Sequence, residues 1–463
     1  MNESSVAVAP RTAERVVVRV NSPAARWVGG LALLSAACWL IAIVVREHTQ
    51  GHGEPPGRLA WSLTVLAAVA LVARGIFLGR PVTAKHAAVA SLILFIGIAA
   101  HVLSFDFLGY VLIGGTGLAL MWPTSARCRP GDLPRVWQLV NATSGDPLAP
   151  FAMQANKCYH FSADGTAALA YRTRIGYAVV SGDPIGDETQ FPQLVADFAA
   201  MCHTRGWRIV VVACSERRLG LWTDPVVLGQ SLRPVPIGRD VVIDVANFEM
   251  VGRKFRNLRQ AVKRTHNFGI TTEIVAEQEL DEKLLAELTD VLKASPSGAH
   301  TERGFSMNLD GALEGRYPGI QLIIARDANG RVQGFHRYAL AGGGSDVTLD
   351  APWRRRGAPN GIDERLSVDM ITAAKEAGAQ RLSLAFAAFP EIFDDKNRGR
   401  MQSLFYHLIH LLDPLIALES LYRYLRKFRS LGERRYALVS MTRVLPLAFV
   451  LLTLEFMPRR RRL

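Results

Sequence analysis

The sequence contains no CxxC motif and none of the short motifs that mark several enzyme classes. Its five cysteines stand at positions 38, 128, 158, 202 and 214, and none forms a CxxC pair. The chain also contains no Walker phosphate loop, no GxSxG nucleophile elbow and no HExxH zinc helix. These absences remove several enzyme classes. We expect reduced thiols rather than disulfides, and no metal site.

Acidic residues are in deficit. The 463 residues include 54 Lys and Arg against 41 Asp and Glu, which gives a formal net charge of +13. Such an excess favours anionic partners, either nucleic acid or acidic lipid headgroups, without deciding between them. The length suffices for two or three domains with sizeable cores.

Long apolar runs are confined to the first 122 residues. Four stand out, at residues 25–45, 59–78, 87–103 and 108–122. Since a helix needs about 20 apolar residues to cross the hydrocarbon core, the first two are long enough. The third and fourth are shorter, and either a tight hairpin or one re-entrant element fits them. We therefore expect a membrane region of about four helices over residues 25–122, after a tail of residues 1–24. The alternative is a buried pair of soluble helices.

Cationic residues flank these runs unevenly. They precede the first run, lie between the second and third, and follow the fourth: Arg11, Arg15, Arg19, Arg26, Arg80, Lys85, Arg127, Arg129 and Arg135. By the positive-inside rule, this pattern places the amino terminus and everything after residue 122 in the cytoplasm. The first run is too long for a cleavable signal peptide. We thus expect a multi-pass protein of the cell membrane.

Strand-like and helix-like segments alternate after residue 123. "ALAYRTR", "YAVVSGDPIGD" and "RIVVVAC" resemble strands, and "FPQLVADFAAMCHTRG" resembles a helix. A second, similar block includes a hairpin around Asn329-Gly330 and a helix in "IDERLSVDMITAAKEAG". The pattern predicts an α/β or α+β fold in two domains, at residues 123–235 and 236–440. Residues 441–463 form a short apolar helix with a basic tail, either at a membrane interface or packed on the core.

The stretch "GRKFRNLRQAVKR", residues 252–264, has six cationic side chains and no acidic one. As a helix it places Phe255, Leu258 and Val262 on one stripe and most of its charge elsewhere. A solvated face, a membrane surface and a polyanionic substrate each fit this pattern.

The segment "TLDAPWRRRGAPNGID", residues 348–363, joins a strand to a helix. Backbone N–H groups at a helix start beside arginines can hold an anion, and Asp350 can accept a proton or hold an ammonium. Arg354-x-x-Gly357 fits the start of a coenzyme A loop, but Pro359 supplies no N–H where that loop needs a small residue. The alternative is a solvent-exposed loop with no ligand, in which Asn360 caps the helix.

These segments, together with "LESLYRYLRKFRSLGERRYALVS", resemble the bacterial aminoacyl-phosphatidylglycerol transferases, of which phosphatidylglycerol lysyltransferase is the best known. The resemblance covers about residues 150–445, and "GYAVVSGDPIG" is similar to a signature in the family's first half. It implies tandem acetyltransferase-like (GNAT) folds that move an amino acid from aminoacyl-tRNA to a lipid headgroup. It implies no coenzyme A or other cofactor.

Carried over by position, the resemblance implies three sets of site residues. The catalytic set is Asp350, Arg354 and Asp363. The substrate-binding set is Asn360, Gly361, Arg355, Lys427 and Arg429. A tRNA- or lipid-binding set is Arg256, Arg259, Lys263 and Arg264. The chain departs from the family pattern at Trp353, where an arginine is usual, and in "LAFAAFP".

We therefore expect a membrane-bound aminoacyltransferase that uses aminoacyl-tRNA and an anionic lipid such as phosphatidylglycerol. Asp350 and Asp363 would hold the donor's ammonium, and Arg354, with Arg355, a phosphate. His336 is the nearest candidate base, although a hairpin histidine is more often structural. Two alternatives stay open: a membrane-anchored acyltransferase that uses coenzyme A, and a non-enzymatic binder of acidic lipid or RNA.

Overall fold

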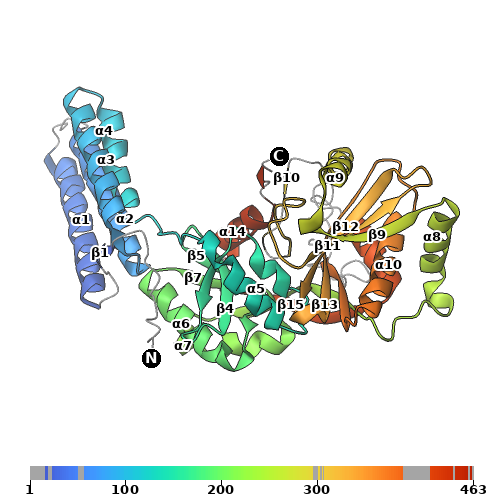
Figure 1. Cartoon of the computed structure of the whole chain (residues 1–463). Helices are drawn as coiled ribbons and strands as arrows, with labels where there is room; N and C mark the ends of the chain where they lie inside the picture. Colours follow the sequence, from blue (N-terminus) through green and yellow to red (C-terminus); the bar gives the residue numbers. More distant parts are fainter. Residues whose placement is uncertain are drawn as a thin grey trace, which may run out of the picture. The chain divides into compact units, whose positions relative to one another are not determined.

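The computed structural model describes residues 16–18, 23–50, 57–295, 301–302, 305, 307–388, 418–441, 444–456 and 459–460. The chain forms two compact units (Figure 1). The first comprises Met1–Arg127, Thr173–Ala178 and Asp197–Ile209, and the second comprises the rest.

Four helices dominate the first unit. They are α1 (Pro23–Gln50), α2 (Gly57–Phe77), α3 (Ala84–Val102) and α4 (Asp106–Leu120). Strand β1 (Val16–Val18) pairs with β2 (Val82–Thr83). Small residues bring the helices together, since a Cβ on Gly117 would lie 2.4 Å from the Ala68 carbonyl oxygen of α2. The four apolar runs are therefore helical, as the sequence predicts.

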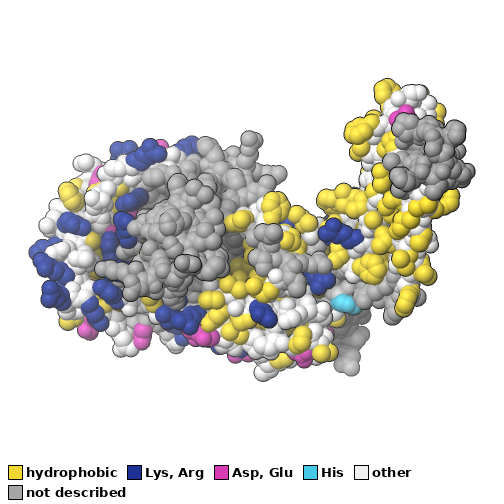
Figure 2. Space-filling view, turned by 180° about the vertical axis from the view of Figure 1, so that it is seen from behind, with side chains coloured by type: hydrophobic (Ala, Val, Ile, Leu, Met, Phe, Trp, Pro, Cys, Tyr) yellow, Lys and Arg dark blue, Asp and Glu magenta, His cyan; other side chains and the backbone are white. Residues whose placement is uncertain are grey.

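Two of these helices are long and apolar enough to cross a membrane, over Ala60–Phe77 and Ala84–Val102. The apolar parts Trp27–Ile43 and Asp106–Leu120 are shorter. Large hydrophobic side chains cover much of the unit's surface (Figure 2). Trp27, Trp39, Phe95 and Phe107 are each more than 60% exposed, at 74%, 67%, 72% and 82%.

A 12-stranded sheet lies mostly in the second unit, with parts of three strands in segments that belong to the first. Its strand order is β3-β4-β5-β7-β15-β8-β14-β13-β12-β11-β9, with β6 paired to β4. Its first strands and their helices are α5 (Leu133–Ala142), β3 (Cys158–Phe161), β4 (Ala167–Arg174), β5 (Tyr177–Ser181), β6 (Ile185–Gly186), α6 (Phe191–Thr204), β7 (Arg208–Ser215) and α7 (Pro225–Leu228). The predicted strands and the predicted helix of this block are confirmed.

The second block continues the same sheet. Its elements are β8 (Arg233–Asp244), α8 (Arg256–Asn267), β9 (Thr271–Ala276), α9 (Glu282–Ala294), β10 (Thr301–Glu302), β11 (Ile320–Arg326), β12 (Val332–Ala341), β13 (Asp346–Arg354), α10 (Ile362–Glu376), β14 (Arg381–Ala388), α13 (Leu418–Leu425), β15 (Leu431–Val439), α14 (Val444–Phe456) and β16 (Arg459–Arg460). The hairpin of β11 and β12 turns at Asn329-Gly330, as expected.

Strand β15 joins the two blocks, because it pairs antiparallel with β7 on one side and β8 on the other. Strands β13 and β14 run parallel, and their pairing extends only from Asp346↔Arg381 to Thr348↔Ser383. Asp350 therefore lies on β13 beyond the point where this pairing ends.

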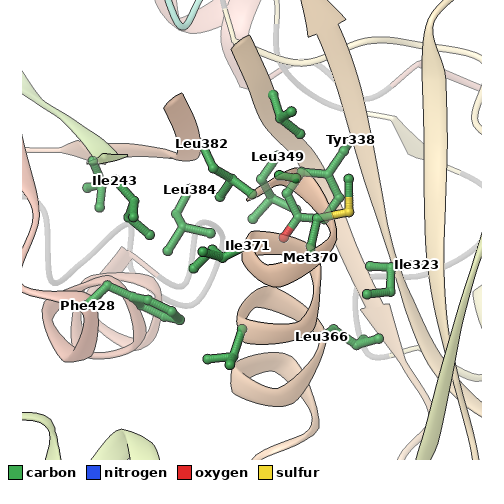
Figure 3. Packing of buried hydrophobic residues seen from close by; sticks show 14 of the residues in the cluster. Ile243, Ile323, Tyr338, Leu349, Leu366, Met370, Ile371, Leu382, Leu384 and Phe428 are labelled. Carbon is green, nitrogen blue, oxygen red and sulfur yellow. The ribbon is translucent and has the colours of Figure 1, made fainter. Parts of the chain in front are cut away.

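Helix α10 packs its apolar face on this part of the sheet (Figure 3). Leu366, Met370 and Ile371 recur at helical spacing and are buried against strand residues such as Leu349 and Leu382. Burying each such side chain stabilises the fold by about 1.5–3 kcal/mol. This packing fixes the amino-terminal end of α10, where the predicted site residues lie.

One expectation about the cysteines is wrong. Cys128 and Cys158 form a disulfide, with their Cα atoms 4.3 Å apart. Cys158 begins β3, and the fold brings this strand back to the segment that carries Cys128. The sequence did not predict this contact because the two cysteines are 30 residues apart. The predicted apolar helix near the end is confirmed as α14. Residues 389–417 and 461–463 lie outside the described residues. They include the end of "LAFAAFP" and part of the predicted basic tail.

Candidate active site

Two neighbouring residues of β12, His336 and Arg337, divide the predicted catalytic residues into two clusters. Successive side chains of a strand point to opposite faces of the sheet. The His336 Nε2 atom lies 3.3 Å from Oδ1 of Asp363, and Arg337 Nη1 lies 2.9 Å from Oδ2 of Asp350. Asp350 and Asp363 therefore lie on opposite faces of β12.

The Asp350 cluster is closed. Arg337 also donates to Oε2 of Glu277 at 2.8 Å, and the Leu309 N–H donates to Asp350 Oδ1 at 2.7 Å. The side chains of Arg337, Asp350 and Glu277 have no exposed surface. Burial raises the pKa of Asp350 to about 6, although Arg337 opposes the shift. This geometry gives Asp350 a structural role, and its contact with a substrate stays a prediction.

The Asp363 cluster is open to solvent. Asp363 lies in the first turn of α10, and its side chain is 24% exposed. Arg354 Nη1 lies 3.5 Å from its Oδ2, and that arginine side chain is 45% exposed. Burial raises the pKa of Asp363, but the hydrogen bond and charge of His336 and the charges of Arg354 and Lys427 outweigh it and lower the pKa. Asp363 is therefore an ionised carboxylate that a ligand can reach.

Lys427 lies beside this cluster but bonds to the next acidic residue, Glu364. Phe428 is fully buried in the core and holds that segment in place. Arg429 adopts a left-handed backbone conformation, is exposed, and lines a shallow pocket with Arg426. The structure thus places Lys427 near Asp363, whereas Arg429 belongs to a different surface feature.

Gly361 sets the start of α10 against α8. Its φ is 102°, and a Cβ there would lie 2.8 Å from the Ala261 carbonyl oxygen of α8. Only glycine combines this backbone conformation with so close an approach. The side chain of Asn360 is exposed and makes no capping bond.

Helix α8 carries the predicted basic surface directly beside the α10 start (Figure 1). Leu258, Ala261 and Thr265 are buried. Of the predicted stripe, Phe255 and Leu258 are buried and Val262 is partly buried against the core. The other face carries Arg256, Lys263 and Arg264, all exposed and without an ion pair to any acidic side chain that the structure describes. Figure 2 shows Lys and Arg gathered at this end of the unit.

Arg259 differs from its neighbours on α8. Its guanidinium donates to the carbonyl oxygens of Met250 and Gly252, the latter at 2.8 Å. It therefore holds the loop before the helix.

Arg355 and Trp353 lie away from the site. Arg355 donates to Asp290 of α9 at 2.6 Å and to the Val332 carbonyl oxygen at 2.8 Å. The Trp353 ring packs on Phe335, with centroids 5.0 Å apart. Trp353, where the resemblance implies an arginine, thus covers the α9 side of the sheet.

Two clusters escaped the sequence reasoning. Arg435 is buried among three carboxylates and donates to Asp146, Asp183 and Asp240. Its one sequence signal is a charged residue that enters the apolar run "RYALV". The hydroxyl groups of Tyr338, Ser367 and Tyr424 also form a buried row. Side chains alternate between the two faces of a strand, so the position of Tyr338 two residues after His336 was the signal that could have placed both on one face.

Comparison with known proteins places this geometry in a family. Residues 137–439 match the model for the carboxy-terminal part of phosphatidylglycerol lysyltransferase. The chain is 75% identical to an MprF-like domain protein of Mycobacterium tuberculosis over 98% of this chain and 94% of that protein. It is 27% identical to the lysylphosphatidylglycerol biosynthesis bifunctional protein LysX of Mycobacterium bovis over 91% of this chain, but it spans only 34% of that protein.

Solved structures agree with the fold. L-PGS from Bacillus licheniformis superimposes with a TM-score of 0.60 and 20% identity, over 71% of this chain and 97% of that one. The carboxy-terminal domain of a putative lysylphosphatidylglycerol synthetase from Agrobacterium fabrum gives 0.59 and 22%, over 70% and 97%. These likenesses establish the mixed α/β architecture. The model describes the carboxy-terminal part of phosphatidylglycerol lysyltransferase and covers more than half of this chain. This protein therefore belongs to the phosphatidylglycerol lysyltransferase family.

Proposed function

We propose that this protein moves an amino acid, of lysyl or alanyl type, from aminoacyl-tRNA to the hydroxyl of a lipid headgroup such as phosphatidylglycerol. The observation that carries the proposal is the Asp363 cluster, an ionised and reachable carboxylate beside a half-exposed arginine and a basic helix. Transfer of a cationic group would change the charge of the membrane surface.

The cluster supplies both charges that the substrates need. Asp363 can hold the ammonium of the aminoacyl group, because its lowered pKa keeps it ionised. Arg354 can hold a phosphate of the lipid or of the tRNA end, since its guanidinium is 45% exposed. Lys427 and Asn360 are the members of the predicted substrate-binding set that lie beside this cluster, and Gly361 lets α10 approach α8 closely.

Helix α8 is the proposed contact for the tRNA backbone. Arg256, Lys263 and Arg264 form an exposed cationic face beside the α10 start. Phosphate contacts of this kind position a nucleic acid without reading its sequence. The acceptor end of the tRNA would then lie over Asp363.

The reaction needs positioning more than covalent help. The lipid hydroxyl oxygen attacks the ester carbonyl carbon, a new ester bond forms, and the bond to the tRNA ribose oxygen breaks. The hydroxyl proton ends on that ribose oxygen. Orienting the two substrates alone contributes about 7–11 kcal/mol. His336 has no exposed side-chain surface, so its proposed part in the proton transfer acts through Asp363, to which it is hydrogen-bonded.

The helical unit is the proposed membrane anchor, with about four helices over residues 25–122. Its exposed tryptophans and phenylalanines support this, as do the two helices of spanning length. Flanking positive charge supports a cytoplasmic catalytic unit. The Cys128–Cys158 disulfide is an observation against a cytoplasmic location of this unit, because disulfides are rare in the cytoplasm. We retain the division into tandem acetyltransferase-like domains, at 123–235 and 236–440, as part of the proposal.

Coenzyme A is a poorer donor for this site. Its pyrophosphate would approach the amino-terminal end of α10, where Asp363 and Glu364 occupy the first turn. Pro359 adds no N–H donor to the loop that would hold a pyrophosphate. An aminoacyl group with a free ammonium is the better match.

The experiment is lipid labelling. Membranes that contain the full chain are incubated with tRNA charged with one radiolabelled amino acid at a time, and lipids are separated by thin-layer chromatography. We expect a labelled lipid that requires charged tRNA and is lost when the tRNA is digested first. Absence of labelled lipid with every aminoacyl-tRNA contradicts the proposal, and saturable acetyl-CoA binding would favour the coenzyme A alternative.

A further inference from the structure

A pocket with charged side chains in its wall lies within the second unit, apart from the Asp363 cluster. It has a volume of about 170 Å³ and crosses strands β15, β8, β14 and β13. Its lining residues are Gly145, Pro147, Asp240, Val242, Asp346, Val347, Thr348, Arg381, Ser383, Gly432, Glu433 and Arg435.

The pocket lies on the face of the sheet opposite α10. Val347 and Leu382 point into the core that α10 covers. Because side chains alternate, those of Asp346, Thr348 and Ser383 point to the other face. No residue of the Asp363 cluster lines the pocket.

Two buried acceptors in the pocket wall have no partner. Asp240 is 3% exposed, and its Oδ2 accepts from Arg435 Nε at 2.7 Å while its Oδ1 has no hydrogen-bond partner among the described residues. Ser383 is 2% exposed, and its Oγ likewise has no partner in that part of the chain. Buried polar atoms in native proteins are nearly always satisfied by protein or by water, so these two atoms are open to a ligand that donates hydrogen bonds.

The charges around the pocket are unbalanced toward acid. Its lining contains the carboxylates of Asp240, Asp346 and Glu433 against the guanidiniums of Arg381 and Arg435. Both guanidiniums are already occupied. Arg381 donates twice to Asp346, at 2.6 and 3.1 Å. Arg435 also donates to Asp146 and Asp183 behind the wall.

We propose that this pocket binds the ammonium group of a small amine. An ammonium group has three donors and no acceptor, which matches the free Asp240 and Ser383 oxygens and the excess of carboxylates. The pocket has room for a short alkylammonium chain.

The ligand is a free amine that acts as an effector, because the pocket and the Asp363 cluster lie on opposite faces of the sheet and one aminoacyl group cannot reach both. The binding experiment below needs neither tRNA nor lipid, so its result is independent of the labelling experiment.

The test is calorimetric titration of the full chain in detergent with n-pentylammonium, compared with n-pentanol, which has the same carbon chain and no charge. We expect binding of the ammonium and none of the alcohol. Ser383→Ala should weaken ammonium binding about tenfold, because a hydrogen bond to a charged group is lost. Glu433→Gln, an exposed position, should weaken it about twofold.

Glu376→Gln is the matched control, an exposed carboxylate of α10 outside the pocket, and should bind as the unmodified chain does. Unchanged melting of each variant without ligand excludes misfolding as the cause. Absence of ammonium binding, equal binding of pentanol, or unchanged binding by Ser383→Ala overturns the proposal.

Kinetics then test the effector role. Added pentylammonium should change the lipid-labelling rate of the unmodified chain but not of Ser383→Ala. An equal response of the two proteins would place the effect outside this pocket.

Discussion

The two faces of strand β12 hold two carboxylate–arginine clusters of the same chemistry but opposite character. On one face Arg337 and Asp350 have no exposed surface, and burial raises the pKa of Asp350 to about 6. On the other, Arg354 and Asp363 are 45% and 24% exposed, and the pKa of Asp363 is lowered. The comparison teaches that solvent access, not residue type, separates an ion pair that holds the fold from one that can bind a substrate.

The largest expected effect is on stability. Arg337→Ala leaves the Asp350 and Glu277 carboxylates buried without their partner, so it should lower the free energy of unfolding by about 3–5 kcal/mol. Arg354→Ala breaks an exposed pair and should cost about 0–1 kcal/mol. Chemical denaturation of the full chain in detergent measures both. Equal losses in the two variants would remove the distinction between the clusters.

The reverse ranking is expected for activity. Asp363→Asn removes the charge that holds the donor and should lower the labelled-lipid rate about 100-fold, comparable to the loss of one key electrostatic group in other enzymes. Its unfolding free energy should change little. Asp350→Asn, assayed where it is folded, should retain most of the rate. A larger loss in Asp350→Asn than in Asp363→Asn would reverse the assignment.

The basic helix should affect substrate binding alone. Replacing Arg256, Lys263 and Arg264 with Gln should raise KM for aminoacyl-tRNA about tenfold. The slope of log affinity against log salt concentration should become shallower by roughly 0.7–0.9 for each phosphate contact that is lost. The control replaces Lys283 and Lys293, exposed on α9, with Gln. An unchanged salt slope with weaker binding to anionic vesicles would assign α8 to the lipid surface instead.

The smallest expected effect is on the pH dependence of stability. Because the folded-state pKa of Asp350 is about 6, above its ordinary 3.8, protonation favours the folded state. Relative to Asp350→Asn, the unmodified chain should gain about 1 kcal/mol as pH falls from 7.5 to 5. The pKa of Asp363 is lowered, so its contribution persists above pH 3.8 and the difference from Asp363→Asn should stay flat over this range. Denaturation at both pH values measures this, and parallel slopes for the two variants would contradict it.

Much of this architecture follows from the sequence because its signals are local. The Asn329-Gly330 turn, the apolar stripe of α8 and the strand-to-helix junction before α10 each lie within one segment. The separation of Asp350 from Asp363 does not. It depends on Arg337, which reaches Asp350 across a strand pair, and on a register shift between Arg337 and Tyr338.

Long-range pairing explains the other failures. Strand β15 inserts between β7 and β8, which no local pattern encodes, and this insertion brings Arg435 to Asp183 and Asp240. The disulfide depends likewise on the return of β3 to the segment that carries Cys128. These features appear only when the sheet order is known.

The most direct measurement compares lipid labelling from charged tRNA by membranes that contain the unmodified chain, Asp363→Asn or Asp350→Asn, at equal amounts of folded protein. The account predicts a labelled lipid with the unmodified chain, nearly as much with Asp350→Asn, and about 100-fold less with Asp363→Asn. Labelling that is absent from all three, or equal in the unmodified chain and Asp363→Asn, would contradict it.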